Sequence, residues 1–254
     1  MNIKQFAQTA INNFDSHKEA VLRSESLKQM KKLILQFNTL PPFNDKIDPE
    51  EYYLSTAMLE REMDFHLSNN DTKNFENAFM KIKQFYFDFN NQFPKSDKRL
   101  YFIGLFLLHL LVNNRSTEFS TELEALDVQD MNDHFIYIPR YLNECFMEGK
   151  YKKVSVIKTQ VDDHHYKFYL NMFNNAVRYE IVRSIEKSHD SIKISKFKDL
   201  LGFESDQELR EYIKKECENF DSNKEIEWKI VDDSINFTPV IFSLFFTLFV
   251  FIFK

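Results

Sequence analysis

The side chains of this 254-residue sequence that could carry out chemistry are its histidines, its cysteines and a few closely spaced charges. His164 and His165 form the one histidine pair and follow Asp162 and Asp163 directly. Neighbouring residues point about 100° apart on a helix, whereas ligands of a shared metal ion need i, i+4 spacing. We therefore interpret this pair as part of a solvated first helical turn. His109 lies inside the apolar run LLHLLV and is predicted to be a hydrogen-bonded core residue rather than a catalyst.

Other reactive or charged groups give no stronger signal for a catalytic site. Cys145 and Cys217 are too few and too far apart for a disulfide framework or a zinc site. Arg115, Glu118 and Glu122 have the spacing of charge partners within one helix, which we favour, and contacts with another subunit are the alternative. The patterns HExxH, CxxC, GxSxG, GxGxxG and the phosphate-loop signature do not occur. The sequence therefore predicts no enzyme, no cofactor and no metal site.

Glycine is scarce, at 3 residues, and this limits the folds that the chain can form. Because glycine supplies the left-handed backbone of hairpin turns and phosphate loops, Rossmann, P-loop and tightly turned all-β folds fit poorly. The net charge of −6 argues against a general nucleic-acid binder, which needs a cationic surface. The first residues, MNIKQFAQTAINNFD, lack the unbroken apolar stretch of a secretory signal, so we expect a reducing, intracellular location.

Apolar residues recur at helical spacing as far as about residue 190. Residues 3–14 carry one apolar stripe, and Ser16 with Glu19 predicts a capping box for a second helix that extends to Phe37. Three prolines at 39–49 predict a loop. Further helices are predicted at 50–68, 71–89, 96–112 (with a buried core run at 101–112), 116–126, 134–147, 150–159 and 162–189. Short turns between successive helices indicate a TPR-like helical-repeat array, an α-solenoid, over residues 1–190.

The pattern changes after residue 190. A short strand is predicted at 192–194, followed by helices at 195–202 and 205–218. Trp228 and Ile230 alternate on one strand, Ile235 and Phe237 alternate on the next, and Asp232-Asp233 lies at the turn of this predicted hairpin. Strand, helix, helix and hairpin is the order of a winged helix, which we predict at 191–238. The helix at 205–218 carries five acidic residues against three basic ones, so we predict contact with protein rather than with DNA.

Four segments of the chain resemble segments of a known family. They are FYFDFNNQFP at 85–94, GLFLLHLLVNNRSTEFSTELEAL at 104–126, IPRYLNECFMEGKYKKV at 138–154, and RYEIVRSIEKSHDSIKISKFKDLLGFESDQELREYIKKE at 178–216. The likeness extends over about residues 50–238. The chain resembles the proteasome non-ATPase regulatory subunit 8 family, which are PCI-domain subunits in the lid of the proteasome regulatory particle.

The resemblance implies an all-α helical-repeat array followed by a winged-helix (PCI) subdomain with a small β-hairpin. It implies a non-catalytic structural role in lid assembly and in joining the lid to the base, for ubiquitin-dependent protein degradation in the cytoplasm and nucleus. The implied partners are other lid subunits, contacted through the winged helix, and base subunits in the assembled particle; no nucleic acid is expected. A PCI subunit of the signalosome or of a translation-initiation complex is the alternative within this fold. We predict subunit-interface residues in the hairpin, with closure of the winged-helix core as the alternative for each: Trp228, Ile230, Ile235 and Phe237.

The hydrophobic tail at 239–254 departs from this family, in which the wing is followed by an amphipathic helix with acidic residues. Residues 240–253 carry no charge, and the run is shorter than the ~20 residues that usually cross a bilayer. Three interpretations stay open for it: a short membrane anchor, a fully buried helix of a helical bundle, or an alternative or mispredicted terminus, such as an intron sequence read as coding. The first makes a tail-anchored membrane adaptor the alternative function.

Overall fold

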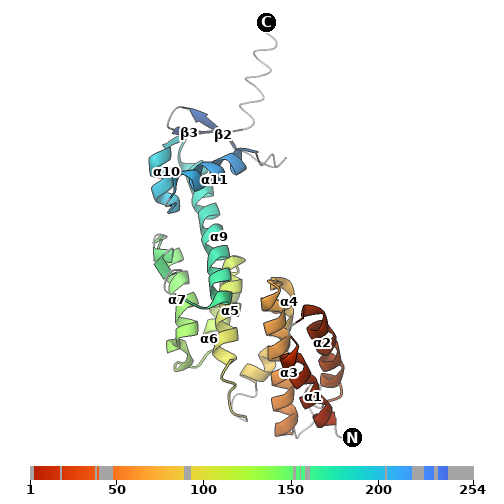
Figure 1. Ribbon diagram of the computed structural model, residues 1–254. Helices are drawn as coiled ribbons and strands as arrows, with labels where there is room; N and C mark the ends of the chain where they lie inside the picture. The colour runs from red at the N-terminus through yellow and green to blue at the C-terminus, as the bar shows by residue number, and fades with distance from the viewer. Residues whose placement is uncertain are drawn as a thin grey trace. The chain divides into compact units, whose positions relative to one another are not determined.

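The computed structural model shows a mainly helical chain with a small antiparallel sheet near its C-terminal end (Figure 1). It describes residues 3–17, 19–37, 39, 48–88, 93–150, 153–154, 156–157, 161–203, 205–218, 226–231 and 234–239. The chain divides into two compact units. The first contains Met1–Tyr141 and Asp163–Tyr169, and the second contains Leu142–Asp162 and Leu170–Lys254.

The first unit is built from helices that follow one another along the chain. They are α1 (Ile3–Ser16), α2 (Ala20–Ile34), α3 (Pro49–Ser68), α4 (Thr72–Phe87), α5 (Arg99–Val112), α6 (Ser116–Glu124), the 3-10 helix η1 (Asp130–Asn132), the first part of α7 (His134–Met147), as far as Tyr141, and the start of α9 (His164–Ser188). Three consecutive pairs, α1–α2, α3–α4 and α5–α6, are in contact. The predicted helices at 3–14, 50–68, 116–126 and 134–147 are confirmed to within two residues at each end.

Helix α5 belongs to the core of this unit because its sequence is apolar on nearly every side. Its residues from 102 to 111 are buried, as predicted for a core helix, and the Phe106 ring stacks on Phe79 of α4 at 3.9 Å between ring centroids. Gly104 permits close packing on this helix, because a Cβ there would clash with the Tyr166 hydroxyl oxygen. That hydroxyl donates a hydrogen bond to the carbonyl oxygen of Phe135 at 3.2 Å. A small residue in α5 therefore lets α7 and α9 pack closely against it.

Left-handed residues end four of the described helices, three of them in turns of one kind, although glycine is scarce. Asn70 after α3, Asn114 after α5 and Gly149 after α7 have φ angles of 55°, 56° and 69°. In each turn two backbone N–H groups return to carbonyls of the last helical turn; Arg115 N–H, for example, donates to Leu110 O at 3.0 Å. This is the Schellman arrangement, which satisfies the last carbonyls of a helix. Asparagine replaces glycine in two of these turns because it tolerates the left-handed region.

The start of a helix agrees with the prediction where the preceding side chain can form a capping hydrogen bond. Asp71 was expected to begin α4, and its carboxylate accepts a hydrogen bond from the Asn74 N–H at 3.2 Å. The predicted capping box of Ser16 and Glu19 is wrong. Ser16 is still inside α1 and its hydroxyl donates to the Asn13 carbonyl at 2.9 Å, so it is not available to cap α2.

The second unit ends in a three-stranded sheet. Its elements are the end of α7, most of α9, β1 (Ser191–Lys193), α10 (Ile194–Leu201), α11 (Asp206–Glu218), β2 (Ile226–Val231) and β3 (Ser234–Pro239). The strand order is β1-β3-β2, and both pairs are antiparallel. The strand, the two helices and the hairpin therefore occur in the order expected from the sequence.

Some predicted features lie outside the described residues. They include most of the proline loop at 39–49, Phe89, the Asp232-Asp233 turn and the tail from residue 240 onwards. Of the helix predicted at 150–159, residues 153–154 and 156–157 are helical. In the part of the chain that is described, no helix is both long enough and apolar enough to span a membrane.

Candidate interaction surface

The β2–β3 hairpin is held in place by Trp228. Its indole N–H donates a hydrogen bond of 2.5 Å to the Glu186 carboxylate of α9. The indole ring also meets Phe197 of α10 and Phe237 of β3 edge to face, with centroids 5.8 and 5.4 Å away. Edge-to-face packing of this kind is favourable beyond the apolar area that it buries. The tryptophan therefore ties the hairpin to two helices of the second unit.

Ile235 and Phe237 of the central strand β3 complete this small core. Ile235 is fully buried and lies opposite Ile192 of β1 on one side and Ile230 of β2 on the other. Phe237 is also buried, and its backbone N–H donates to the Asp190 carbonyl at 2.9 Å. The structure thus places Trp228, Ile235 and Phe237 inside the second unit.

Ile230 differs from the other three residues predicted for a subunit interface. Its side chain is 55 % exposed, although alternation puts it on the same face of β2 as Trp228, which is 5 % exposed. It lies towards the end of the strand, and β2 is an edge strand of the sheet. Ile230 is therefore the member of this set that can contact another protein while the hairpin stays folded.

Arg178 of α9 supports the turn between α10 and α11, a role that the sequence did not predict. Its guanidinium donates to the carbonyls of Leu201 at 3.2 Å and Gly202 at 3.4 Å. It also lies 4.0 Å above the ring of Phe203, and burial lowers the pKa of its side chain. Gly202 ends α10 with a φ of 64°. No local spacing signals such a contact, because its partners lie more than 20 residues away along the chain.

The histidines have the structural roles expected of them. His109 is buried in α5, and its Nε2 lies 3.3 Å from a carboxylate oxygen of Glu76. Burial lowers the pKa of His109. His164 and His165 occupy the first turn of α9, where the ring planes are almost perpendicular. The described ranges contain no group of three His, Cys, Asp or Glu side chains that could hold a metal ion.

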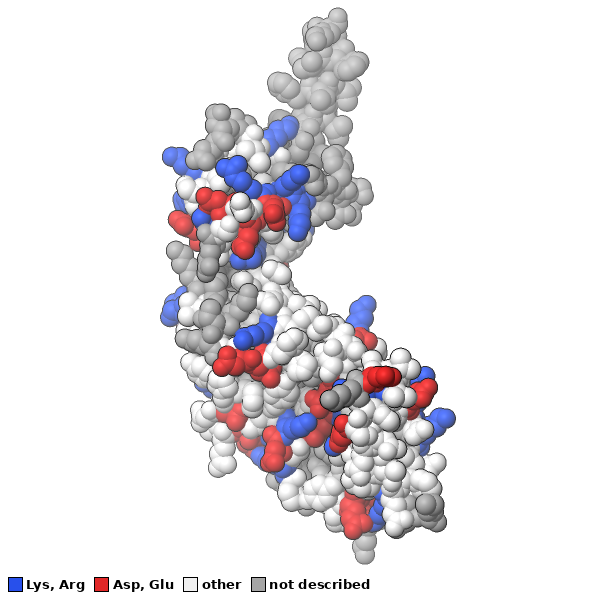
Figure 2. Space-filling model, viewed as in Figure 1, with Lys and Arg blue, Asp and Glu red and all other residues white. Residues whose placement is uncertain are grey.

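The predicted charge partners in α6 are confirmed only in part. Arg115 donates to Glu118 at 2.7 Å, as the spacing indicated, and it also pairs with Glu76 of α4. Glu122 does not join them. Its buried carboxylate pairs with Lys83 of α4, because the packing of α4 near α6 supplies a partner that the local sequence does not contain. On the face shown in Figure 2, acidic and basic side chains are mixed over each unit.

Comparison with known proteins decides the family. The family model of the CSN8/PSMD8/EIF3K family matches residues 98–231, from the start of α5 to the end of β2. The chain belongs to the CSN8/PSMD8/EIF3K family. It is 32% identical over 216 residues to the Arabidopsis thaliana protein named 26S proteasome non-ATPase regulatory subunit 8 homolog A, a match that covers 84% of this chain and 78% of that protein.

A second family member is similar over a shorter stretch. The Saccharomyces cerevisiae protein named 26S proteasome regulatory subunit RPN12 is 31% identical over 168 residues, which are 64% of this chain and 58% of that protein. The resemblance to the subunit 8 family that the four sequence segments indicated is therefore confirmed. Helices α1 to α4 precede the region that the family model matches.

Proposed function

We propose that this chain is a non-catalytic structural subunit of the proteasome regulatory-particle lid, which supports lid assembly and the joining of lid and base. The observation that carries the proposal is the 32% identity, over 84% of the chain, to a protein named as a 26S proteasome non-ATPase regulatory subunit. The proposed site of action is the cytoplasm and nucleus, in ubiquitin-dependent protein degradation. The relatives' names give no support to a tail-anchored membrane adaptor.

The finer architecture is part of this proposal. We assign residues 1–190 to a TPR-like helical-repeat array, 191–238 to the winged-helix part of a PCI domain, and 239–254 to a hydrophobic tail. Contacts within the consecutive pairs α1–α2, α3–α4 and α5–α6 support the array. The order β1, α10, α11, β2, β3 supports the winged helix. In this arrangement Trp228, Ile235 and Phe237 hold the hairpin, and Ile230 meets a neighbouring lid subunit.

Replacement of Ile230 by aspartate tests the contact in a folded subunit. Ile230→Asp should lower the free energy of unfolding by no more than about 1 kcal/mol, because the exposed position adds no buried charge and the cost is that of aspartate in a strand. We expect less of the variant than of the wild-type chain to co-sediment with the regulatory particle from its own cells. Val128→Asp, at a residue 78 % exposed outside this unit, is the matched control and should assemble normally. Normal assembly of Ile230→Asp would reject Ile230 as a contact, and wild-type chain that never co-sediments would reject the lid role.

A further inference from the structure

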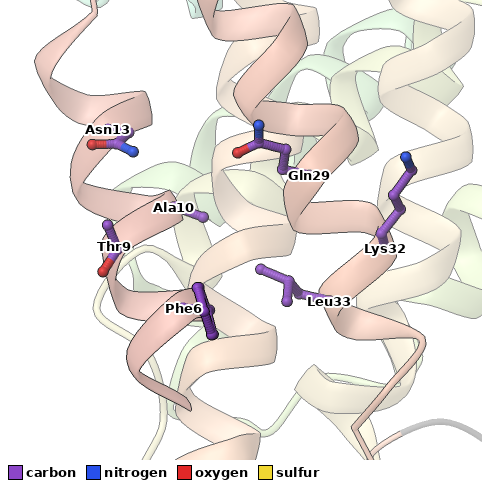
Figure 3. Close-up of a pocket in the computed structure, with 7 residues that line it drawn as sticks. All are labelled: Phe6, Thr9, Ala10, Asn13, Gln29, Lys32 and Leu33. Atoms are coloured by element: carbon purple, nitrogen blue, oxygen red, sulfur yellow. The ribbon is translucent and has the colours of Figure 1, made fainter. Parts of the chain in front are cut away.

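A groove of about 370 Å³ runs between α1 and α2, at the N-terminal end of the chain (Figure 3). It is lined by Phe6, Thr9, Ala10 and Asn13 of α1 and by Gln29, Lys32 and Leu33 of α2. Figure 3 shows Phe6 and Ala10 facing Leu33 and Gln29 across the space between the helices. The family model matches from residue 98 onwards, so the groove lies outside the region that this model describes.

Apolar side chains are exposed along this groove. The Phe6 side chain is 47 % exposed, Ile3 one turn earlier on α1 is 41 % exposed, and Leu33 is half-buried. The opposite stripe of α1, which includes Ile11 and Phe14, is buried. Helix α3 contacts both α1 and α2, and yet no residue of α3 lines the groove. One side of the pair is thus covered by the protein itself, while an aromatic ring and two aliphatic side chains are left open on the other.

The charges around the groove favour an acidic partner. Residues 3–34 contain six Lys and Arg against three Asp and Glu, whereas the whole chain has 33 basic and 39 acidic residues. Lys4 and Lys31 are already paired with acidic residues at the start of α3 and in its middle. Lys32 on the groove is exposed, as is Lys28 one turn earlier, and the described residues offer neither of them an ion pair. Glu25, one turn before Gln29, is exposed as well, so this face of α2 carries two lysines against one glutamate. The excess of one positive charge favours carboxylates of another molecule.

The backbone of the groove favours a helix as the bound element. Its walls are two α-helices, whose N–H and C=O groups are already bonded within each helix. An extended peptide would find no main-chain partners there and would leave its own backbone groups unpaired when buried. A helix satisfies its backbone internally and needs only side-chain contacts. The Asn13 and Gln29 side chains supply polar contacts at the edge.

We propose that this groove binds an amphipathic α-helix of a partner protein, with apolar side chains over Phe6, Ala10 and Leu33 and acidic side chains beside Lys32 and Lys28. A second copy of this chain docked through the same face is disfavoured, because a two-fold axis would bring the same lysines together. Phe6 to Asn13 spans about 10 Å of helix, which matches about two turns of the partner. The proposal does not depend on the lid role, because the binding is to be measured on the isolated full chain.

Photo-cross-linking in cells can identify the partner segment. Benzoylphenylalanine placed at Phe6 should cross-link to a segment of another protein with apolar residues at i, i+3, i+4 and i+7 and with acidic flanks. The same probe at Met80, which is 44 % exposed on α4, is the control for nonspecific capture. A cross-link to lipid, to a second copy of this chain or to no protein would overturn the proposal. So would a cross-linked segment without acidic residues.

Binding to the purified full chain then tests the contacts. The probe is the cross-linked segment made as a synthetic peptide, followed by fluorescence anisotropy. Phe6→Asp should weaken binding about tenfold or more, and Lys32→Glu about fivefold. Met80→Asp and Lys73→Glu, which change an exposed apolar residue and an exposed lysine of α4, should bind as the wild type does. Equal binding by Phe6→Asp and the wild type, with unchanged circular dichroism, would contradict the groove as the site. Because no proteasome is present in this assay, its outcome is independent of the lid role.

Discussion

The β2–β3 hairpin and the α1–α2 pair both carry regularly spaced apolar side chains, and they differ in how many of them other elements cover. In the hairpin, Trp228, Ile235 and Phe237 are at most 6 % exposed, and only the side chain of Ile230 is open among the four residues predicted there. In the α1–α2 pair, Ile3 and Phe6 remain more than 40 % exposed, and Phe6 lines a groove. Helices α9 and α10 supply the cover in the first case, whereas α3 covers one side only in the second. A stripe of apolar residues therefore predicts which face of an element can be buried. Whether that face becomes core or stays open for binding depends on whether another element packs on it.

The largest effect is expected from Ile235→Asp combined with Phe237→Asp. Burying two carboxylates without partners should lower the free energy of unfolding of the second unit by about 4 kcal/mol or more. Trp228 is the only tryptophan of the chain and lies in this unit, so its fluorescence during urea unfolding reports the change. Incorporation into the lid should fall as well, while most of the helical circular dichroism signal remains. An unchanged free energy of unfolding would show that Ile235 and Phe237 are not core residues. The hairpin would then not differ from the α1–α2 pair in how its apolar side chains are covered.

Gly104→Ala should destabilise the first unit by about 2–4 kcal/mol. The added Cβ would meet the Tyr166 hydroxyl and lie 2.5 Å from the Phe135 backbone carbonyl, so the helices would have to move apart. Gly149→Ala is the matched control. It has open space around the Cβ but a φ of 69°, so only the cost of the left-handed backbone, about 1 kcal/mol, should be measured by chemical denaturation. Equal losses in the two variants would argue against close packing at Gly104.

Arg178→Met should lower the stability of the second unit by about 1–2 kcal/mol. The variant keeps an apolar side chain against Phe203 and loses the hydrogen bonds to Leu201 and Gly202. Arg178→Lys, which retains the charge without the planar guanidinium, should recover only part of the loss. Trp228 fluorescence in urea again gives the measurement. If Arg178→Met unfolds at the wild-type midpoint, the packing of α9 against this turn does not stabilise the hairpin region.

The smallest effect on stability is expected at the open groove. Phe6→Ser should change the free energy of unfolding by no more than about 1 kcal/mol, because this ring is already half in solvent. Circular dichroism during thermal unfolding provides the comparison with the wild type. A loss of 2 kcal/mol or more, an order of magnitude typical of core truncations, would show that Phe6 belongs to the core and would remove the contrast with the hairpin.

Much of the helical framework could be predicted from the sequence because its signals are local. The helix at 134–147 agrees with α7 at both ends, and α4 begins directly after Asp71, where a helix was predicted to start. Predictions from local sequence failed in two situations. In one, a side chain has two possible hydrogen-bond partners nearby; in the other, its partner lies far away along the chain. Ser16 bonds back into α1 instead of capping α2, and Glu122 finds Lys83 on α4 instead of Arg115.

The candidate surfaces were harder to predict because exposure is a property of the folded unit. Alternation along β2 gives Trp228 and Ile230 the same face, and yet only Trp228 is covered by α10 and held by α9. The helical period of α1 likewise predicted one apolar stripe and could not tell that Phe6 lies at its open edge. The contacts of Arg178 could not be predicted from local spacing, because their partners lie more than 20 residues away. The family, in contrast, could be identified from the four sequence segments and is confirmed by the comparisons.

Identification of the proteins that co-purify with this chain tests whether it acts by assembling with other proteasome subunits. The full chain would be affinity-purified without detergent from its own cells, and co-purifying proteins would be quantified by mass spectrometry. We expect proteasome lid and base subunits at near-equal abundance with the chain. Recovery of the chain alone, or recovery only from membranes, would contradict it.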